Sequence, residues 1–246
     1  VSTVAEDARE TALEFGLGIE LAEFCTAYNM DVDFDRWDAA ARGNMEGIGL
    51  RAFHAPFNEL CPAAIDPLIA DVARRRFRQA FGLMRGYGID RMVVHSGYVP
   101  LVYDKSYFTD RSIEFWGELL RDLRGDFTLL LENVMEPSPD MLRDIVRGVG
   151  DPRLRLCLDI GHAGTIVSDL PMPLWIDGCA GFLSHVHIHN NYREYDDHNP
   201  PGEGRIDVAA ALRSLAGLGS GVTFTLEARR GRESAQWLEN NKFLYV

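Results

Sequence analysis

All seven histidines of the chain lie at or just beyond the ends of short apolar runs, where buried strands would end. They are His54, His95, His162, His185, His187, His189 and His198. Imidazole nitrogen is a common ligand for zinc and other divalent metals. Because no histidine falls elsewhere, this placement predicts a metal site assembled from the ends of many strands.

Carboxylates end three of the apolar runs, at Glu132, Asp159 and Glu227. A carboxylate at the end of a buried strand is costly unless it is paired or bound to a metal. Asp159 precedes His162 by three residues, and a glycine between them allows a sharp turn. Asp196 precedes His198 by two residues and makes a second local pair of acid and histidine. For Glu227, a structural salt bridge to a following arginine is the alternative interpretation.

Three histidines alternate with β-branched residues in the run 184–190, at the period of a strand. The three imidazoles therefore face the same side, which would be the interior of a barrel. Because each residue advances a strand by about 3.3 Å, the three cannot bind one metal equally. We expect His187 to be the ligand, His185 to lie deeper as hydrogen-bonding support and His189 to lie nearer the loop.

Eight strand-like runs alternate with amphipathic stretches that have helical periodicity. The strand-like runs are 1–4, 18–24, 50–57, 91–97, 127–133, 154–161, 182–190 and 222–228. The helical stretches are 6–15, 34–44, 67–87, 113–123, 140–149, 207–218 and 233–240. The link 163–181 contains Pro171 and Pro173, and we expect it to be mostly irregular.

This alternation predicts an α/β protein with a parallel sheet, because parallel strands need long crossovers that helices supply. Eight repeats favour a single-domain (β/α)8 TIM barrel over residues 1–246. A doubly wound open sheet is the alternative, but it would gather its ligand site at one switch point. Here polar residues end strand after strand. The first strand starts at residue 1, which leaves open whether residues precede it.

Composition narrows the class of protein and its partners. A chain of 246 residues that is 46% hydrophobic can bury a barrel-sized core. The net charge of -12 argues against a nucleic-acid partner, since an acidic surface repels phosphates. Four cysteines without CxxC spacing are too sparse for a disulfide scaffold, which indicates the cytoplasm. We expect no membrane segment, no signal peptide and no nucleotide cofactor, and a homo-oligomeric state stays open.

An ordered series of short motifs runs along nearly the whole chain. It consists of Phe53-His54-Ala55-Pro56, His95-Ser96-Gly97, Glu132-Asn133, Asp159-Ile160-Gly161-His162, His187-Ile188-His189-Asn190, Pro201-Gly202-Glu203-Gly204 and Leu226-Glu227. Taken together, these motifs resemble the xylose isomerase-like TIM barrels, a superfamily that includes sugar phosphate isomerases and epimerases, ketose 3-epimerases and endonuclease IV.

The resemblance to the epimerases implies one divalent metal, commonly Mn²⁺, with Zn²⁺ and Mg²⁺ as alternatives. Its implied ligands are Glu132, Asp159, His187 and Glu227. It also implies that His162 and Arg193 hold the substrate. Asn190 stands where the epimerase motif has glutamate.

The resemblance to endonuclease IV implies a larger set of nine ligands for three zinc ions. It adds His54, His95, His162, Asp196 and His198 to the four ligands of the epimerase pattern. Ser96 replaces a proline of that pattern and Asn190 replaces an aspartate.

These patterns lead to a hypothesis and two alternatives. We expect a metal-dependent isomerase or epimerase that acts on a sugar or sugar phosphate by proton transfer through a metal-stabilised enediolate. Glu132 and Glu227 would be the catalytic residues that exchange the proton. The alternatives are a multinuclear zinc phosphodiesterase of endonuclease IV type and a non-catalytic barrel that binds a sugar or a regulatory partner.

Overall fold

The computed structural model describes residues 1–219 and 221–244 of the chain. Its sheet has seven strands that are all parallel and are paired in chain order. The strands are β1 Ile19–Leu21, β2 Arg51–His54, β3 Arg91–His95, β4 Thr128–Glu132, β5 Leu154–Asp159, β6 Leu183–Ile188 and β7 Thr223–Leu226.

Residues 1–3 fill the gap between β7 and β1 and so close the sheet. The N–H of Ser2 donates to the carbonyl oxygen of Leu226 at 2.8 Å, and Ser2 also pairs in parallel with Glu20 of β1. The first predicted strand is therefore an isolated bridge in the eighth strand position. Together with β1–β7 it gives the predicted (β/α)8 barrel.

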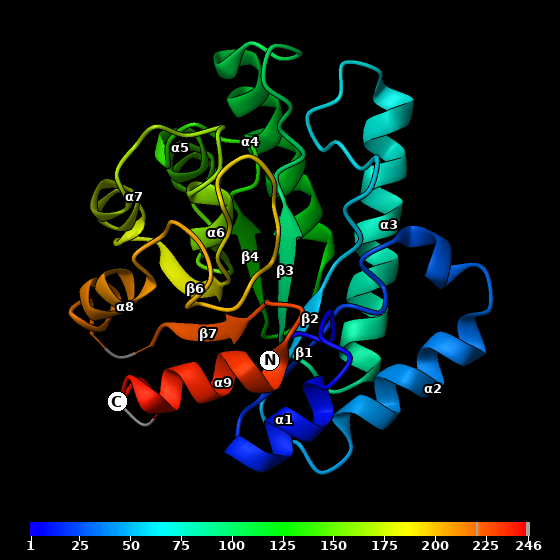
Figure 1. Cartoon of the computed structure of the whole chain (residues 1–246). Coiled ribbons are helices and arrows are strands. Elements are labelled where there is room, and N and C mark those ends of the chain that lie inside the picture. Colours follow the sequence, from blue (N-terminus) through cyan, green and yellow to red (C-terminus); the bar gives the residue numbers. More distant parts are fainter. Residues whose placement is uncertain (220, 245–246) are drawn as a thin grey trace.

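Helices cover the outside of the strands, as Figure 1 shows. They are α1 Ala8–Phe15, the 3-10 helix η1 Ala27–Met30, α2 Phe34–Met45, α3 Pro67–Gly86, α4 Lys105–Asp122, α5 Asp140–Val149, α6 Ile160–Ala163, α7 Met172–Cys179, α8 Val208–Ala216 and α9 Gly231–Asn240. In the part of the chain that the structure describes, no helix has the length and apolar character needed to cross a membrane.

The link 163–181 is irregular over 164–171 and 180–181, but it also contains a helix that the sequence did not predict. Helix α7 begins directly after Pro171, and Pro173 lies in its first turn. Proline is tolerated there because the first N–H groups of a helix have no partner within it. Trp175 and Ile176 are buried by this helix.

Helix α4 begins at Lys105, eight residues before the start that the sequence predicts. Asp104 caps it, because its Oδ1 accepts hydrogen bonds from the N–H groups of Ser106 at 2.9 Å and Tyr107 at 3.1 Å. The capping bonds stabilise the polar first turns, which carry little hydrophobic periodicity.

The two faces of the barrel strands have different partners. The outward side chains belong to the main hydrophobic core, together with the helices. Inside the barrel, Val93, Leu130 and Cys157 form a separate small apolar cluster. Each stands two residues before a polar residue that ends its strand, so the alternation of a strand directs both to the barrel interior. On β3, β4 and β5, the polar residues therefore lie one step above apolar side chains.

Candidate metal centre

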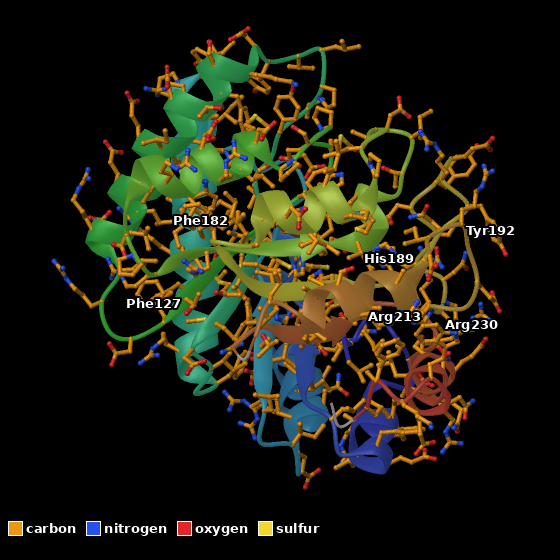
Figure 2. All side chains as sticks on the ribbon, turned by 90° about the vertical axis from the view of Figure 1, so that its left-hand side faces the viewer. Phe127, Phe182, His189, Tyr192, Arg213 and Arg230 are labelled. Carbon is orange, nitrogen blue, oxygen red and sulfur yellow. The ribbon has the colours of Figure 1, made fainter. Side chains whose placement is uncertain are left out.

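The carboxyl ends of the parallel strands meet at one mouth of the barrel. Strands β2, β3, β4 and β5 end at His54, His95, Glu132 and Asp159. Figure 2 shows His189, Tyr192 and Arg230 at this end of the molecule, with Phe127 and Phe182 towards the other. In (β/α)8 barrels the active site lies at the carboxyl ends of the strands.

The four ligands of the epimerase pattern gather around His187. Its Nδ1 lies 2.9 Å from Glu132 Oε1, 3.0 Å from Glu227 Oε2 and 3.6 Å from Asp159 Oδ2. One donor atom from each residue lies within 4.8 Å of the others, and all four residues are buried. Three carboxylates and an imidazole supply the donors and the negative charge that a divalent cation requires, so the residues fit a metal.

Glu132 faces two groups of donors at once. Its second oxygen, Oε2, lies 3.0 Å from His95 Nε2 and 3.4 Å from His54 Nε2. No group in the described chain donates to this buried oxygen in hydrogen-bonding geometry. His54 Nδ1 lies 2.9 Å from the carbonyl oxygen of Ala55, and a proton on Nδ1 would leave the Nε2 lone pair directed at Glu132. The two oxygens of Glu132 therefore face different candidate ligands, His187 on one side and His54 with His95 on the other.

A further group of donors consists of His162, His189, Asp196 and His198, whose donor atoms also lie within 4.8 Å of one another. Asp196 Oδ2 is 3.2 Å from His162 Nε2 and 2.9 Å from His198 Nε2. His189, expected only nearer the loop, stacks on His198 with ring centroids 4.1 Å apart. Its buried Nδ1 has no hydrogen-bond partner among the described residues. All nine residues of the larger ligand pattern are thus brought together.

The junction of β5 and α6 is held by Asn133. Its side chain donates to the Asp159 carbonyl oxygen at 2.9 Å and accepts from the Asp159 N–H at 2.8 Å. The N–H of His162 then donates to Asp159 Oδ1 at 2.7 Å, which caps α6. A Cβ at Gly161 would lie 2.0 Å from the His189 ring, so only glycine lets this imidazole approach. The predicted pair of Asp159 and His162 does face the mouth.

Below the donors lies a buried carboxylate, Glu20 on β1, that the sequence analysis missed. His185 lies deeper than His187, as predicted, with Nε2 3.2 Å from Glu20 Oε2 and Nδ1 2.7 Å from Thr223 Oγ1. Glu20 also lies 3.1 Å from His187 Nε2. A lone glutamate between Ile19 and Leu21 in an apolar run was the available signal, because an unpaired buried carboxylate is costly.

Carboxylates and imidazoles of the centre shift one another's pKa. Burial raises the pKa of Glu132, but the charges of His187 and His95 outweigh burial and hold this pKa well below its ordinary value. Burial lowers the pKa of His162, but Asp159 and Asp196 outweigh it and hold this pKa well above its ordinary value. A cation that binds His162 would therefore displace a proton from this imidazole.

Arg193, which the resemblance assigns to substrate binding, forms no ion pair with a donor among the described residues. Its guanidinium pairs with Asp169. It lines a cavity of about 600 Å³ beside α6 and α7, together with Arg205, and none of the nine donors lines that cavity. His162 contacts other donors whereas Arg193 contacts Asp169, and the substrate-binding role of both residues stays a prediction.

A larger cavity of about 1160 Å³ opens beside the donors and reaches them at His198. It is lined by residues of the N-terminal segment, the end of β7 and α9, including Arg229, Arg230 and Trp237. Arg230 pairs with Glu203 and Glu233 instead of Glu227. Glu227 instead contacts His187, so the salt-bridge interpretation of this glutamate is not what the structure contains.

A family model described as xylose isomerase-like TIM barrel matches residues 15–245 of the chain. Among curated relatives, an uncharacterized protein of Methanocaldococcus jannaschii is 26% identical over 193 residues, which are 74% of this chain and 66% of that protein. The match therefore spans just under two thirds of that relative's length.

Several solved structures share the fold over nearly their whole length. A Thermus thermophilus protein soaked with ZnCl₂ is 26% identical, with a TM-score of 0.78, and the match covers 100% of this chain and 96% of that one. A D-tagatose 3-epimerase-like protein is 22% identical, with a TM-score of 0.77 and coverage of 99% and 95%. An IOLI protein with a bound zinc atom is 19% identical, with a TM-score of 0.72 and coverage of 96% and 91%.

Proposed function

The chain belongs to the xylose isomerase-like TIM barrel family, and from that premise we propose that it is a metal-dependent isomerase or epimerase of a sugar or sugar phosphate. The observation that carries the proposal is the approach of Glu132, Asp159 and Glu227 to His187 Nδ1. The epimerase-like and zinc-containing structural neighbours support it, although these properties belong to those proteins.

Glu132 and Glu227 are the residues proposed to move the proton. A bound divalent cation would polarise the carbonyl and neighbouring hydroxyl oxygens of the sugar and stabilise the negative charge of an enediolate. The two carboxylates reach His187 Nδ1 from different strands, at 2.9 and 3.0 Å. One would take the proton from the substrate carbon, and the other would return a proton to the neighbouring carbon or the opposite face.

The cavity beside His198 is the proposed place for the remainder of the substrate. Trp237 offers an apolar ring of the kind that packs against sugars, and Arg229 offers a cation. Among the described residues, Arg229 has no carboxylate partner for its side chain, in contrast to Arg230. An anionic group such as a phosphate would therefore find a free partner in this cavity.

The proposal is tested by proton exchange at carbon. Wild-type protein loaded with Mn²⁺, Mg²⁺ or Zn²⁺ is incubated in D₂O with ketoses, aldoses and their monophosphates, and deuterium next to the carbonyl is measured by NMR. Glu132→Gln removes a charged ligand and a proton carrier, so we expect exchange to fall by about 10²- to 10⁴-fold.

The matched control is Glu136→Gln, which changes a buried glutamate in the loop after β4. Glu136 accepts hydrogen bonds from Ser96 and from the Val134 N–H. Its carboxylate is therefore held by groups that are not candidate ligands. We expect this variant to retain exchange. Exchange by Glu132→Gln at the wild-type rate would refute the assignment.

A zinc phosphodiesterase of endonuclease IV type is the second candidate. The observation that favours it is that His54, His95 and the pair of Asp196 and His198 all face the centre. Clustered zinc ions would activate water and neutralise the leaving oxygen. The candidate predicts nicking of duplex DNA that contains an abasic site by zinc-loaded protein. If the DNA stays intact under those conditions, the phosphodiesterase candidate is excluded.

A further inference from the structure

Glu20 is a buried carboxylate that the proposed reaction does not use. It lies in the middle of β1, between Ile19 and Leu21, with a fully buried side chain. A charged group at such a position is costly unless neighbouring groups compensate for the lost water. Its neighbours therefore indicate what it does.

The main neighbour of Glu20 is the candidate ligand His187. Glu20 Oε1 lies 3.1 Å from His187 Nε2, and Oε2 lies 3.4 Å from the same nitrogen. On the opposite side of the ring, Nδ1 faces the three carboxylates of the centre. The two nitrogens thus point to two different kinds of carboxylate, one outside the donor group and three within it.

With a cation bound by the donor group, this arrangement selects one form of the imidazole. A neutral ring carries one proton, and its other nitrogen offers the lone pair that a metal binds. A protonated Nε2 donates a hydrogen bond to Glu20 Oε2 at 3.4 Å, which leaves the Nδ1 lone pair directed at the donor group. The negative charge beside Nε2–H also makes Nδ1 a stronger electron donor.

Other side chains fix Glu20 itself. Thr225 Oγ1 donates to Glu20 Oε2 at 3.1 Å, and His185 Nε2 lies 3.2 Å from the same oxygen. His185 is in turn held through Nδ1 by Thr223 Oγ1 at 2.7 Å. A carboxylate with such partners in a buried layer has little freedom to turn away from His187.

We propose that Glu20 is a positioning residue for the metal centre, which fixes the tautomer and orientation of His187 and thereby sets the affinity for the cation. The inference rests on the metal site of the proposed function but not on its reaction. The role belongs to Glu20 because it contacts the ring nitrogen that the donor group leaves free.

The test compares Zn²⁺ binding by wild-type protein and Glu20→Gln in competition with a chromophoric chelator. Glutamine keeps the size of the side chain and loses the charge, so we expect the affinity to fall about 10- to 100-fold. Glu20→Asp, which keeps the charge, should retain more affinity than Glu20→Gln. In zinc-loaded wild-type protein, long-range ¹H–¹⁵N spectra should show His187 protonated at Nε2 alone, and this signature should shift in Glu20→Gln.

Glu23→Gln is the matched control. Glu23 is also buried near the end of β1, but it accepts hydrogen bonds from Asn44 at 2.6 Å and Thr3 at 3.1 Å and does not contact His187. Its zinc affinity should equal that of wild type. If Glu20→Gln fails to fold, Thr225→Val, which removes a hydrogen bond to Glu20, should lower the affinity a few-fold.

The outcomes separate this inference from the proposed function. Wild-type zinc affinity in Glu20→Gln, or an equal loss in Glu23→Gln, would overturn the role of Glu20. An unchanged His187 spectrum in Glu20→Gln would do the same. If zinc affinity depends on Glu20 but the protein shows no proton exchange at carbon, the role of Glu20 is supported and the proposed isomerase function fails.

Discussion

The imidazole of His198 lies between two oxygen acceptors that favour its charged form. Its Nε2 is 2.9 Å from Asp196 Oδ2, and its Nδ1 is 2.7 Å from the carbonyl oxygen of Glu227. Burial lowers the pKa of His198, but the bond to Asp196 and the charge of Glu227 outweigh burial and raise this pKa to about 9. The ring therefore competes for protons with any cation that it binds.

The raised pKa makes the stability of chelator-treated protein depend on pH. Because the folded pKa exceeds the unfolded value of about 6.5, the contribution is fully present below that pH and is lost as pH rises through about 9. We expect the free energy of unfolding in urea to fall over this window, by at most about 3 kcal/mol for His198. The decline should be shallower in His198→Gln. Equal slopes of unfolding free energy against pH in the two proteins would contradict the raised pKa of His198. Zinc affinity should rise over the same pH window, because the imidazole loses its proton there.

Single residues could be predicted where the chemistry follows from local spacing. The alternation around His187 gives its face and its depth relative to His185, and both positions agree with the structure. Glu20 could not be paired with His187 from the sequence, because their contact joins strands 167 residues apart. The position of His189 against His198 also depends on how a loop folds back, which periodicity does not contain.

At the scale of elements, the loop after β6 is organised by the buried side chain of Asn190. Its Nδ2 donates to the carbonyl oxygens of Pro201 at 2.9 Å and Ile206 at 3.1 Å. Its Oδ1 accepts from the N–H groups of Asn191 at 2.9 Å and Ile206 at 3.1 Å. The amide of Asn190 both donates and accepts hydrogen bonds, which explains why asparagine suits this position. An ionised aspartate could not donate to the carbonyl oxygens of Pro201 and Ile206.

We expect Asn190→Asp to lower the free energy of unfolding by about 2 to 4 kcal/mol, because two buried carbonyl oxygens lose their donors and face a negative charge. Asn240→Asp makes the same change at an exposed position of α9 and should alter stability by less than about 0.5 kcal/mol. Urea unfolding at neutral pH measures both. Wild-type stability in Asn190→Asp would show that these bonds do not hold the loop.

The sequence predicts the strands better than the connections between them. Each predicted strand region contains the observed strand or bridge, since buried parallel strands appear as compact apolar runs. Helix α7 and the first turns of α4 were missed because proline at α7 and polar residues at α4 conceal the helical pattern. Their starts depend on capping and packing more than on hydrophobic periodicity.

At the scale of the whole molecule, barrel closure gathers carboxylates and imidazoles at one mouth, where all of them except Asp196 are at least partly buried. The carboxylates come from β4, β5, the end of β7 and the loop after β6, and the histidines between them come from β2, β3, α6, β6 and the segment after β6. Protonated imidazoles and bound cations are alternative ways to balance these carboxylates. The number of cations that the barrel holds therefore depends on which donor groups release their protons.

The isomerase proposal predicts about one tightly bound cation in protein purified without chelators and dialysed, at the group around His187. Asp159→Asn should lose it, whereas His198→Gln should keep it, because His198 lies outside that group. Elemental mass spectrometry measures the content. At a free metal concentration of about 100 times Kd, binding should stabilise the fold by about 2.7 kcal/mol, visible as a lower Tm after chelation. Close to three zinc ions per chain, with about one lost in His198→Gln, would instead favour the phosphodiesterase, because each donor group would then hold its own cation.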